Sequence, residues 1–345
     1  MGKKSITPVV RALDLGFGFT KYSKGLLKND FDLEVSAFAS FAGRSTDSES
    51  IGQALGSLDV LTIEVDGVPY TVGNDSKLAA SGQARQLLEP SFFLSPQYLA
   101  IARGALTFMA VPEDGVIDEL VVGLPLNVYG NETIQTSVVT KLQSTHSVPS
   151  DCGQRAISVR NVTILPQIMG SLIALSAPSG RLAEIQGETN LTIDVGYGTL
   201  LWLVTSGMKP NPMRSGGNMG GVSSILRAIA TAIDSGAGNN VGILDRLDKA
   251  LYSSLPTIKV DGATVNLADY MQHQNAVVTE NMTQMLSAIG NRRDIDNIFL
   301  TGGGSEFYRP AIQAAFPGRV FPTTNMGGRF TNVQGFQIFG ERKVR

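Results

Sequence analysis

Two short stretches of the chain carry the same pattern of residues that could bind a phosphate group. The first begins at Asp14 and continues Leu-Gly-Phe-Gly, and the second begins at Asp194 and continues Val-Gly-Tyr-Gly. Each follows an apolar lead-in and keeps its aspartate, glycines and aromatic residue at matched offsets. A single Gly-x-Gly carries little information in a chain with 38 glycines, but two copies with the same aspartate indicate an internal duplication.

The chemistry of such a stretch follows from its backbone. A strand that enters a Gly-x-Gly turn exposes successive N–H groups, and glycine lets a ligand approach without a Cβ in the way. A concavity of N–H donors binds anions, phosphate above all. A carboxylate beside it would repel phosphate unless a divalent cation lay between them, held through water as Mg²⁺ prefers. The pair therefore predicts a nucleotide polyphosphate held from both sides, whereas either copy alone reads as an ordinary hairpin.

The composition describes a globular protein without a disulfide framework or a zinc site. Hydrophobic residues make up 43% of the 345 residues, which is enough for large cores. The single cysteine, Cys152, cannot form an internal disulfide, and only two histidines are present. A net charge of −2 gives no reason to expect direct nucleic-acid binding.

The sequence shows no membrane or export signal. No apolar run approaches the length that spans a bilayer, and the N-terminal Met-Gly-Lys-Lys lacks the apolar core of a signal peptide. We therefore expect a cytoplasmic protein with no membrane partner.

Strands alternate with helices in the first half of the chain. Strands are predicted over 9–15, 17–22, 118–124 and 162–165, and short strands with turns over 31–41 and 61–72. Helices are predicted over 95–109, 132–142 and 169–175. The Ser/Asp/Gly-rich segment 43–58 predicts a loop, and Asn131 is a candidate N-cap.

The second half repeats this order. Strands are predicted over 192–195, 200–205, 298–301 and 319–321, and helices over 222–233, 241–251, 267–289 and 332–339. The glycine-rich segment 214–221 predicts a flexible loop. Alternating strands and helices in each half indicate an α/β fold with mixed sheets.

Five motifs in order along the chain resemble those of the actin, sugar-kinase and DnaK-type ATPase superfamily, and within it those of plasmid-borne bacterial actin-like proteins of the ParM/StbA kind. They are 14–21 (first phosphate loop, including Lys21), 166–167 with the small-residue helix that follows (first connecting motif), 194–199 (second phosphate loop), 302–305 (adenosine motif) and 332–336 (second connecting helix). Any one of them is weak, and all five in order cover nearly the whole chain.

The resemblance implies a fold and a division into domains. The fold would be an actin-like α/β fold of two duplicated RNase H-like halves with a nucleotide cleft between them. The first domain would span 1–175, with a small insertion at about 36–90. The second would span 176–345, with a helical subdomain at about 215–290.

The resemblance also assigns roles to residues. Asp14 and Asp194 would hold Mg²⁺ through water, and Gln167 would orient the attacking water, so that these three form the catalytic set. ATP and its product ADP would be the bound nucleotides, although the preference for ATP over GTP is not fixed by the sequence. The nucleotide-binding residues would be Gly16, Phe17, Gly18, Lys21, Gly196, Tyr197, Gly198, Thr199, Gly302, Gly303, Gly304 and Ser305. Because glutamine is a weak base, slow hydrolysis that times a conformational cycle is expected.

Three functions are compatible with this superfamily, since fold alone does not decide function. The first is a polymerising ATPase whose filaments move DNA through a DNA-binding adaptor protein, as in plasmid segregation. The length of the chain favours it, because two halves leave no room for a chaperone's peptide-binding domain. The second is a small-molecule kinase, which would need an aspartate base; Asp118 lies at the wrong end of its strand. The third is an ATPase switch that does not polymerise.

Overall fold

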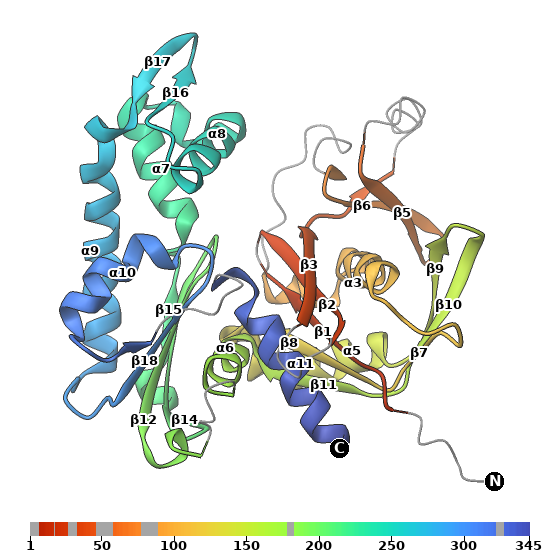
Figure 1. Cartoon of the computed structure of the whole chain (residues 1–345). Helices are drawn as coiled ribbons and strands as arrows, with labels where there is room; N and C mark the ends of the chain where they lie inside the picture. Colours follow the sequence, from red (N-terminus) through yellow and green to blue (C-terminus); the bar gives the residue numbers. More distant parts are fainter. Residues whose placement is uncertain are drawn as a thin grey trace. The chain divides into compact units, whose positions relative to one another are not determined.

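The computed structural model describes residues 7–16, 18–26, 33–45, 58–76, 89–177, 183–321 and 328–345. The chain divides into two compact units (Figure 1). The first consists of residues 1–182 together with 330–345, and the second of residues 183–329. The fold is a mixed α/β fold, as predicted.

The first unit is built on a five-stranded sheet. Its strands are β1 (Val10–Leu15), β2 (Phe19–Leu26), β3 (Leu33–Ala39), β8 (Glu119–Leu124) and β11 (Val162–Pro166), in the order β11-β8-β1-β2-β3. The first three strands run antiparallel as a meander, and β8 and β11 lie parallel to β1. The two faces of β1 carry alternate residues, because successive side chains on a strand point in opposite directions.

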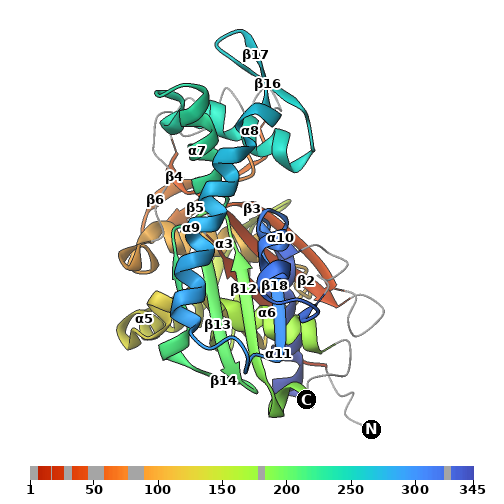
Figure 2. The ribbon, with the colours of Figure 1, turned by 90° about the vertical axis from the view of Figure 1, so that its left-hand side faces the viewer.

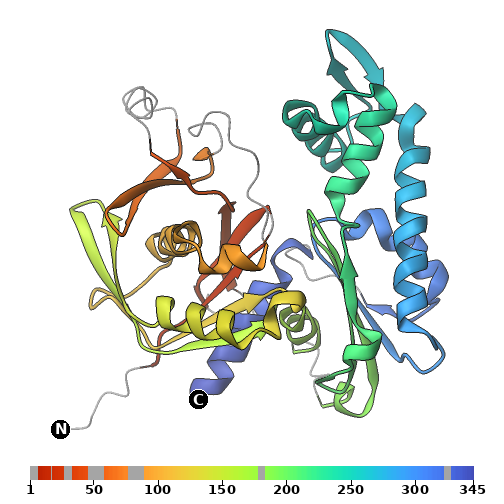
Figure 3. The same ribbon diagram turned by 180° about the vertical axis from the view of Figure 1, so that it is seen from behind.

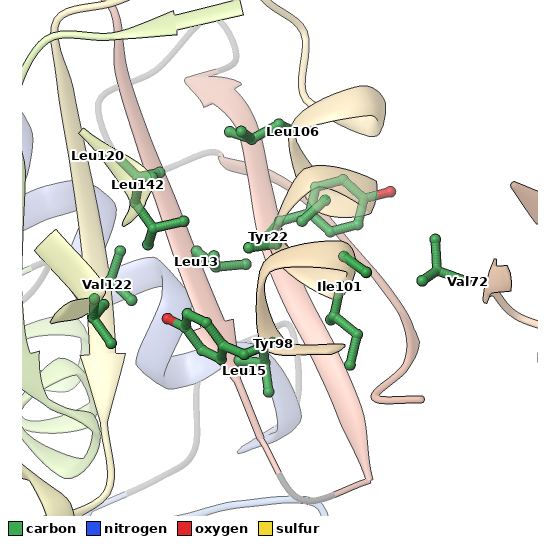
Figure 4. Packing of buried hydrophobic residues seen from close by; sticks show 14 of the residues in the cluster. Leu13, Leu15, Tyr22, Val72, Tyr98, Ile101, Leu106, Leu120, Val122 and Leu142 are labelled. Carbon is green, nitrogen blue, oxygen red and sulfur yellow. The ribbon is translucent and has the colours of Figure 1, made fainter. Parts of the chain in front are cut away.

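One face of this sheet forms the main core of the first unit. Leu13 and Leu15 of β1 join Leu120 and Val122 of β8 in a fully buried cluster, which Figure 4 shows together with side chains of α3 (Pro96–Phe108) and α5 (Glu132–Leu142). The Ser95 hydroxyl caps α3, and Asn131 caps α5 as the sequence predicts. Seen from behind in Figure 3, α3 runs through the middle of the unit with strands around it.

Further strands complete the first unit. They are β4 (Gly43–Arg44), β5 (Val60–Val65), β6 (Val68–Gly73), β7 (Val116–Ile117), β9 (Thr145–Ser150) and β10 (Gly153–Val159), with the short helices η1 (Pro90–Leu94) and α4 (Leu126–Tyr129). The segment 61–72, predicted as short strands with turns, is a hairpin that turns at Asp66 and Gly67, both at positive φ. The β9–β10 hairpin was not predicted from the sequence, and exposed Cys152 lies at its turn.

The opposite face of the sheet is covered by two helices that cross with their backbones in contact. They are α6 (Gln167–Ser176) and α11 (Thr331–Val344). A Cβ on Gly335 would overlap the carbonyl oxygen of Gly170, so neither position tolerates a side chain. Phe336 and Val333 of α11 pack on Ala12 of β1. The expectation that residues up to 345 belong with the second half is therefore wrong for 330–345, because this helix buries its apolar face on the first sheet.

The second unit repeats the topology of the first sheet. Its strands are β12 (Thr189–Val195), β13 (Leu200–Ser206), β14 (Lys209–Pro210), β15 (Gly216–Asn218), β18 (Asn297–Thr301) and β19 (Val320–Phe321), in the order β14-β13-β12-β18-β19 with β15 also on β13. As in the first unit, an antiparallel hairpin is followed by two strands parallel to its first strand. The predicted duplication is thus present in the strand order.

Helices complete the core of the second unit: α7 (Val222–Ile233), α8 (Val241–Tyr252), α9 (Met271–Ile289) and α10 (Ser305–Ala315). Of these, α9 and α10 contact the strands of the sheet, and α8 packs on α7. Figure 2 shows α9 running along the sheet beside α10. Strands β16 (Thr257–Val260) and β17 (Ala263–Asn266) form a hairpin that was not predicted. The short helices are η2 (Ile185–Gly187), η3 (Pro212–Arg214), η4 (Ala237–Asn239), η5 (Leu267–Tyr270) and η6 (Gly328–Phe330).

The predicted flexible loop over 214–221 is wrong for residues 216–218. These residues form β15, which pairs with β13 in the register Trp202↔Gly216 to Leu200↔Asn218. Pairing is possible because glycine at 216 and 217 leaves room for the ring of Trp202 and the side chain of Leu201. Among the described helices, none is long and apolar enough to cross a membrane.

A buried histidine makes the stability of the first unit depend on pH. His146 of β9 is fully buried, its Nε2 lies 2.9 Å from the carbonyl oxygen of Leu142, and Arg103 Nε lies 3.4 Å from its Nδ1. Burial lowers the pKa of His146 from its ordinary value of 6.5; the Leu142 hydrogen bond opposes this shift and the Arg103 charge adds to it. The neutral ring therefore stabilises the folded state above pH 6.5, and this contribution is lost as the pH falls below 6.5.

We predict that the free energy of unfolding falls between pH 7.5 and pH 5.5, and that His146→Gln reduces this fall because glutamine does not titrate. Urea denaturation at the two pH values measures it. His273→Gln, on α9, controls for the replacement of a histidine by glutamine. Equal falls in wild type and His146→Gln would contradict the assignment.

Candidate functional site

The two Asp-x-Gly-x-Gly stretches form the same turn at the same place in their sheets. In the first, the Gly16 N–H donates to the carbonyl oxygen of Phe19 at 3.1 Å; in the second, the Gly196 N–H donates to that of Thr199 at 2.8 Å. The strand registers also match, because Leu15 pairs with Thr20 in one hairpin and Val195 with Leu200 in the other. The duplication seen in the sequence is therefore a duplication of backbone geometry.

Asp14 is a buried carboxylate whose charge is compensated on both oxygens. Its side chain is 1% exposed, Lys21 Nζ lies 2.8 Å from Oδ2, and Gln167 Nε2 donates to Oδ1 at 2.7 Å. Lys21 reaches it because the two residues are opposite one another in the β1–β2 register. An ionised group leaves water only when it is paired in this way. The sequence predicted all three residues for the site but not this contact between them.

Gln167 is oriented by two acceptors. Its Nε2 donates to Asp14 and also, at 3.2 Å, to the carbonyl oxygen of Leu15. Because both partners can only accept, the amide group has one assignment, with Oε1 as the remaining acceptor. Gln167 is the first residue of α6, directly after Pro166 at the end of β11. The structure thus brings the first connecting motif onto the first phosphate loop.

The rest of the first loop is partly described. The Gly18 carbonyl accepts from the Ser40 N–H at 3.1 Å, which ties the loop to the end of β3. Phe17, predicted to contact phosphate, lies outside the described residues. Asp118, considered for a kinase base, lies at the start of β8, where it accepts from the Val9 N–H and pairs with Arg160.

In the second unit, Asp194 lies against the glycine-rich motif. Gly302 has φ +90°, a conformation open to glycine, and a Cβ there would overlap Asp194 Oδ1 and the Val195 carbonyl. The Gly304 N–H donates to that same Val195 carbonyl at 2.9 Å, and Ser305 starts α10. Gly303 between them has open space around its Cβ position. The adenosine motif and the second phosphate loop therefore form one continuous backbone surface.

Two features beside this surface were missed from the sequence. The Gly328 carbonyl accepts from the Gly302 N–H at 3.0 Å and from the Thr301 hydroxyl. Next to it, burial lowers the pKa of Arg329, and Tyr252 and Asp248 of α8 oppose the shift. The partly buried Arg329 thus directly follows the residue that fastens the glycine motif.

The N-terminus of α7 is the second missed feature. The N–H groups of Val222 and Ser223 donate to the carbonyls of Gly196 and Tyr197, at 3.1 and 2.7 Å. These two hydrogen bonds attach the carbonyl groups of the second phosphate loop to the first turn of α7. The glycines at 220 and 221 were the sequence signal for this close packing, but the residues that they contact lie more than twenty positions away in the sequence.

The two sets of predicted site residues belong to different units. Asp14, Gly16, Gly18, Lys21 and Gln167 come together in the first unit. The second unit brings together Asp194, the loop 196–199 and the motif 302–305. Predicted binding roles for these residues remain predictions.

The residues present fit a cation held mainly by water. Among the described residues, no group of three or more His, Cys, Asp or Glu side chains could hold a metal ion. Mg²⁺ keeps several waters and needs few carboxylates when substrate phosphates complete its shell. One buried aspartate beside each glycine turn suits such an ion.

Family comparisons agree with this geometry in both units. Residues 12–170 match the family of actin-like protein N-terminal domains, and residues 192–314 match the C-terminal domain of the archaeal actin homologue MreB-like family. No curated protein matches the chain.

Solved structures share the fold over almost the full chain. The apo psk41 ParM protein is 21% identical, with a TM-score of 0.73 over 98% of this chain and 99% of its own. Ta0583, an archaeal actin homolog, is 20% identical, with a TM-score of 0.76 over 97% and 99%. A 15-stranded ParM filament from Clostridium botulinum is 20% identical, with a TM-score of 0.72 over 98% and 100%.

The fold defined by the two sheets and their paired loops is the actin-like fold. The chain belongs to the actin-like proteins, with an actin-like N-terminal and an MreB-like C-terminal domain. Structures of ParM-type proteins share its fold.

The positive φ of Gly302 generates a prediction. Gly302→Ala should lower the free energy of unfolding by about 2–4 kcal/mol, since it adds backbone strain and an overlap with Val195. Gly303→Ala, one residue along in open space, should change it by less than about 0.5 kcal/mol. Chemical denaturation of the two variants beside wild type measures both. Equal effects would show that the glycine motif does not pack on Asp194 as described.

Proposed function

We propose that the chain is a nucleotide-driven, polymerising actin-like ATPase whose filaments segregate plasmid DNA in the cytoplasm. The observation that carries the proposal is the repeated turn, which gives each duplicated sheet one buried aspartate beside one glycine loop. Two such loops suit the two ends of a polyphosphate chain with its cation. A structure of the archaeal homolog is a complex with ADP, which supports nucleotide binding by this fold.

The first unit would supply the hydrolytic chemistry. Lys21 would offer its charge to the β- and γ-phosphates, exchanging part of its contact with Asp14 for phosphate oxygens. Gln167 would orient the attacking water through Oε1, because its Nε2 is already committed to Asp14 and Leu15. Glutamine cannot act as a strong base, so positioning and charge would provide the catalysis, and hydrolysis would be slow.

The second unit would bind the rest of the nucleotide. The loop 196–199 would contact phosphate through backbone groups, and the motif 302–305 would bring backbone against adenine and ribose. Asp194 and Asp14 would hold Mg²⁺ through water, and the bound ion would neutralise charge on the phosphates. That both loops serve one nucleotide is part of the proposal.

Self-association and an adaptor complete the proposed system. Two of the solved structures that share the fold are filaments, one of ParM and one of Alp12. We propose the same kind of assembly here, with a DNA-binding adaptor protein connecting the filament to its cargo and no direct nucleic-acid contact.

The filament prediction has a direct test. Addition of ATP and Mg²⁺ at protein concentrations well above micromolar should raise light scattering and produce sedimentable filaments. Asp194→Asn should abolish both, because it removes a charge that faces the cation. Asp269→Ala, an exposed aspartate of η5, is the matched control. No scattering with ATP or GTP would contradict polymerisation and favour a switch; transfer of phosphate to a small molecule would favour a kinase.

Gln167 gives a second, separable prediction. Gln167→Ala should slow ATP hydrolysis by about tenfold or more, since it removes the group that orients water, while ATP affinity changes by less than about threefold. Filaments of this variant should also persist longer after ATP addition. Phosphate release and calorimetric titration measure the two quantities, with exposed Gln143→Ala as the control. A loss of affinity as large as the loss of rate would assign Gln167 to binding instead.

A further inference from the structure

A glycine-rich strap, residues 216–221, passes directly over the second phosphate loop. It begins in β15 and leads into α7. A Cβ on Gly221 would lie 2.5 Å from the carbonyl carbon of Gly198 and 2.5 Å from the Thr199 nitrogen, so the two backbones are in contact. The next two N–H groups, of Val222 and Ser223, donate to the loop's carbonyls. The position of the loop therefore depends on the position of the strap.

The strap is held in turn by one buried hydroxyl. Tyr308 of α10 is fully buried, and its hydroxyl donates to the Gly220 carbonyl at 2.5 Å. Asn281 of α9 forms a hydrogen bond with the same hydroxyl, and its own Nδ2 donates to the Val277 carbonyl at 2.8 Å. Burial raises the pKa of Tyr308 to about 12, against the Asn281 hydrogen bond, so the hydroxyl keeps its proton at neutral pH.

A second contact attaches the strap to α9. Asn218 Nδ2 donates to Gln284 Oε1 of α9 at 2.8 Å, and Asn218 Oδ1 accepts from the Gly220 N–H at 3.0 Å. Both the N–H and the carbonyl of Gly220 are thus engaged. A Cβ on Gly220 would overlap the Asn281 amide, so the strap can approach α9 only as glycine.

We propose that Tyr308 is a positioning residue for nucleotide binding: through Gly220 and Gly221 its hydroxyl holds the second phosphate loop in the conformation that accepts phosphate. This inference rests on the proposed function, because it assumes that the loop 196–199 binds the nucleotide. The ring of Tyr308 is part of the apolar core of the second unit. The hydroxyl adds a directional link from α9 and α10 to the loop that a phenylalanine ring would lack.

The test separates the hydroxyl from the ring. Tyr308→Phe keeps the ring and removes the link. Tyr98→Phe is the matched control, because Tyr98 is also fully buried and its hydroxyl has no hydrogen-bond partner among the described residues. Both variants are compared with wild type by hydrogen–deuterium exchange without nucleotide and by calorimetric titration with Mg-ATP.

We expect faster amide exchange in Tyr308→Phe at 196–199 and 220–223, by about fivefold to tenfold, with the rest of the second unit unchanged. Affinity for Mg-ATP should fall by a similar factor. The control should match wild type in both measurements. Trp202, the only tryptophan, packs against Gly216 at the start of the strap, so its fluorescence should report the same displacement.

Three results would overturn the inference. Unchanged exchange at the loop would show that the hydroxyl does not hold it. Exchange that rises throughout the second unit would show a general structural role instead of positioning. Wild-type affinity despite a loosened loop would show that the strap does not govern binding. If wild type itself binds neither ATP nor GTP, the proposed function fails, and the exchange experiment still decides whether Tyr308 positions the loop.

Discussion

Two helix backbones touch where Gly170 of α6 crosses Gly335 of α11, and the geometry of the first unit depends on this contact. Gln167 lies less than one helical turn before the crossing, so the angle and depth at which the helices pack determine where its amide points. Gly123 of β8 serves the same packing, because a Cβ there would lie 2.5 Å from the Phe336 ring and 2.9 Å from Gln167 Cγ. Gln167 can reach Asp14 only because glycine at 123 leaves this face of the sheet without a side chain.

The duplicated turn has different surroundings in the two units. In the first, side chains surround the aspartate: a lysine from the neighbouring strand and a glutamine from a helix. In the second, Gly302 packs against the aspartate, and the strap at 216–221 brings main chain onto the loop. Side-chain groups can transfer charge and orient water, whereas packed main chain provides a fixed shape. The same turn is thus packed by different groups in the two units.

The sequence predicted what depends on local pattern and missed what depends on distant partners. Both hairpins, the cap at Asn131 and the edge strand at 320–321 follow from alternation, capping residues and glycine turns. The C-terminal helix was assigned to the wrong half, because the apolar face of a helix does not indicate which sheet it will cover. The Tyr308 contact was equally out of reach, since its acceptor is 88 residues away in the chain. The strands of the β9–β10 hairpin are mixed and polar, which obscured them. The β16–β17 hairpin was a readable signal that was missed, because β16 alternates as Thr-Ile-Lys-Val and leads into an Asp-Gly turn at 261–262.

The first unit is discontinuous, and this affects the order in which the protein can be completed during synthesis. The second unit is one unbroken segment, 183–329, and can fold as soon as it leaves the ribosome. The first unit waits for α11, which is translated only after the whole of the second unit. Until then Ala12 and Val121 of its sheet lack the helix that covers them, so nascent chains expose an apolar sheet face to chaperones or to each other.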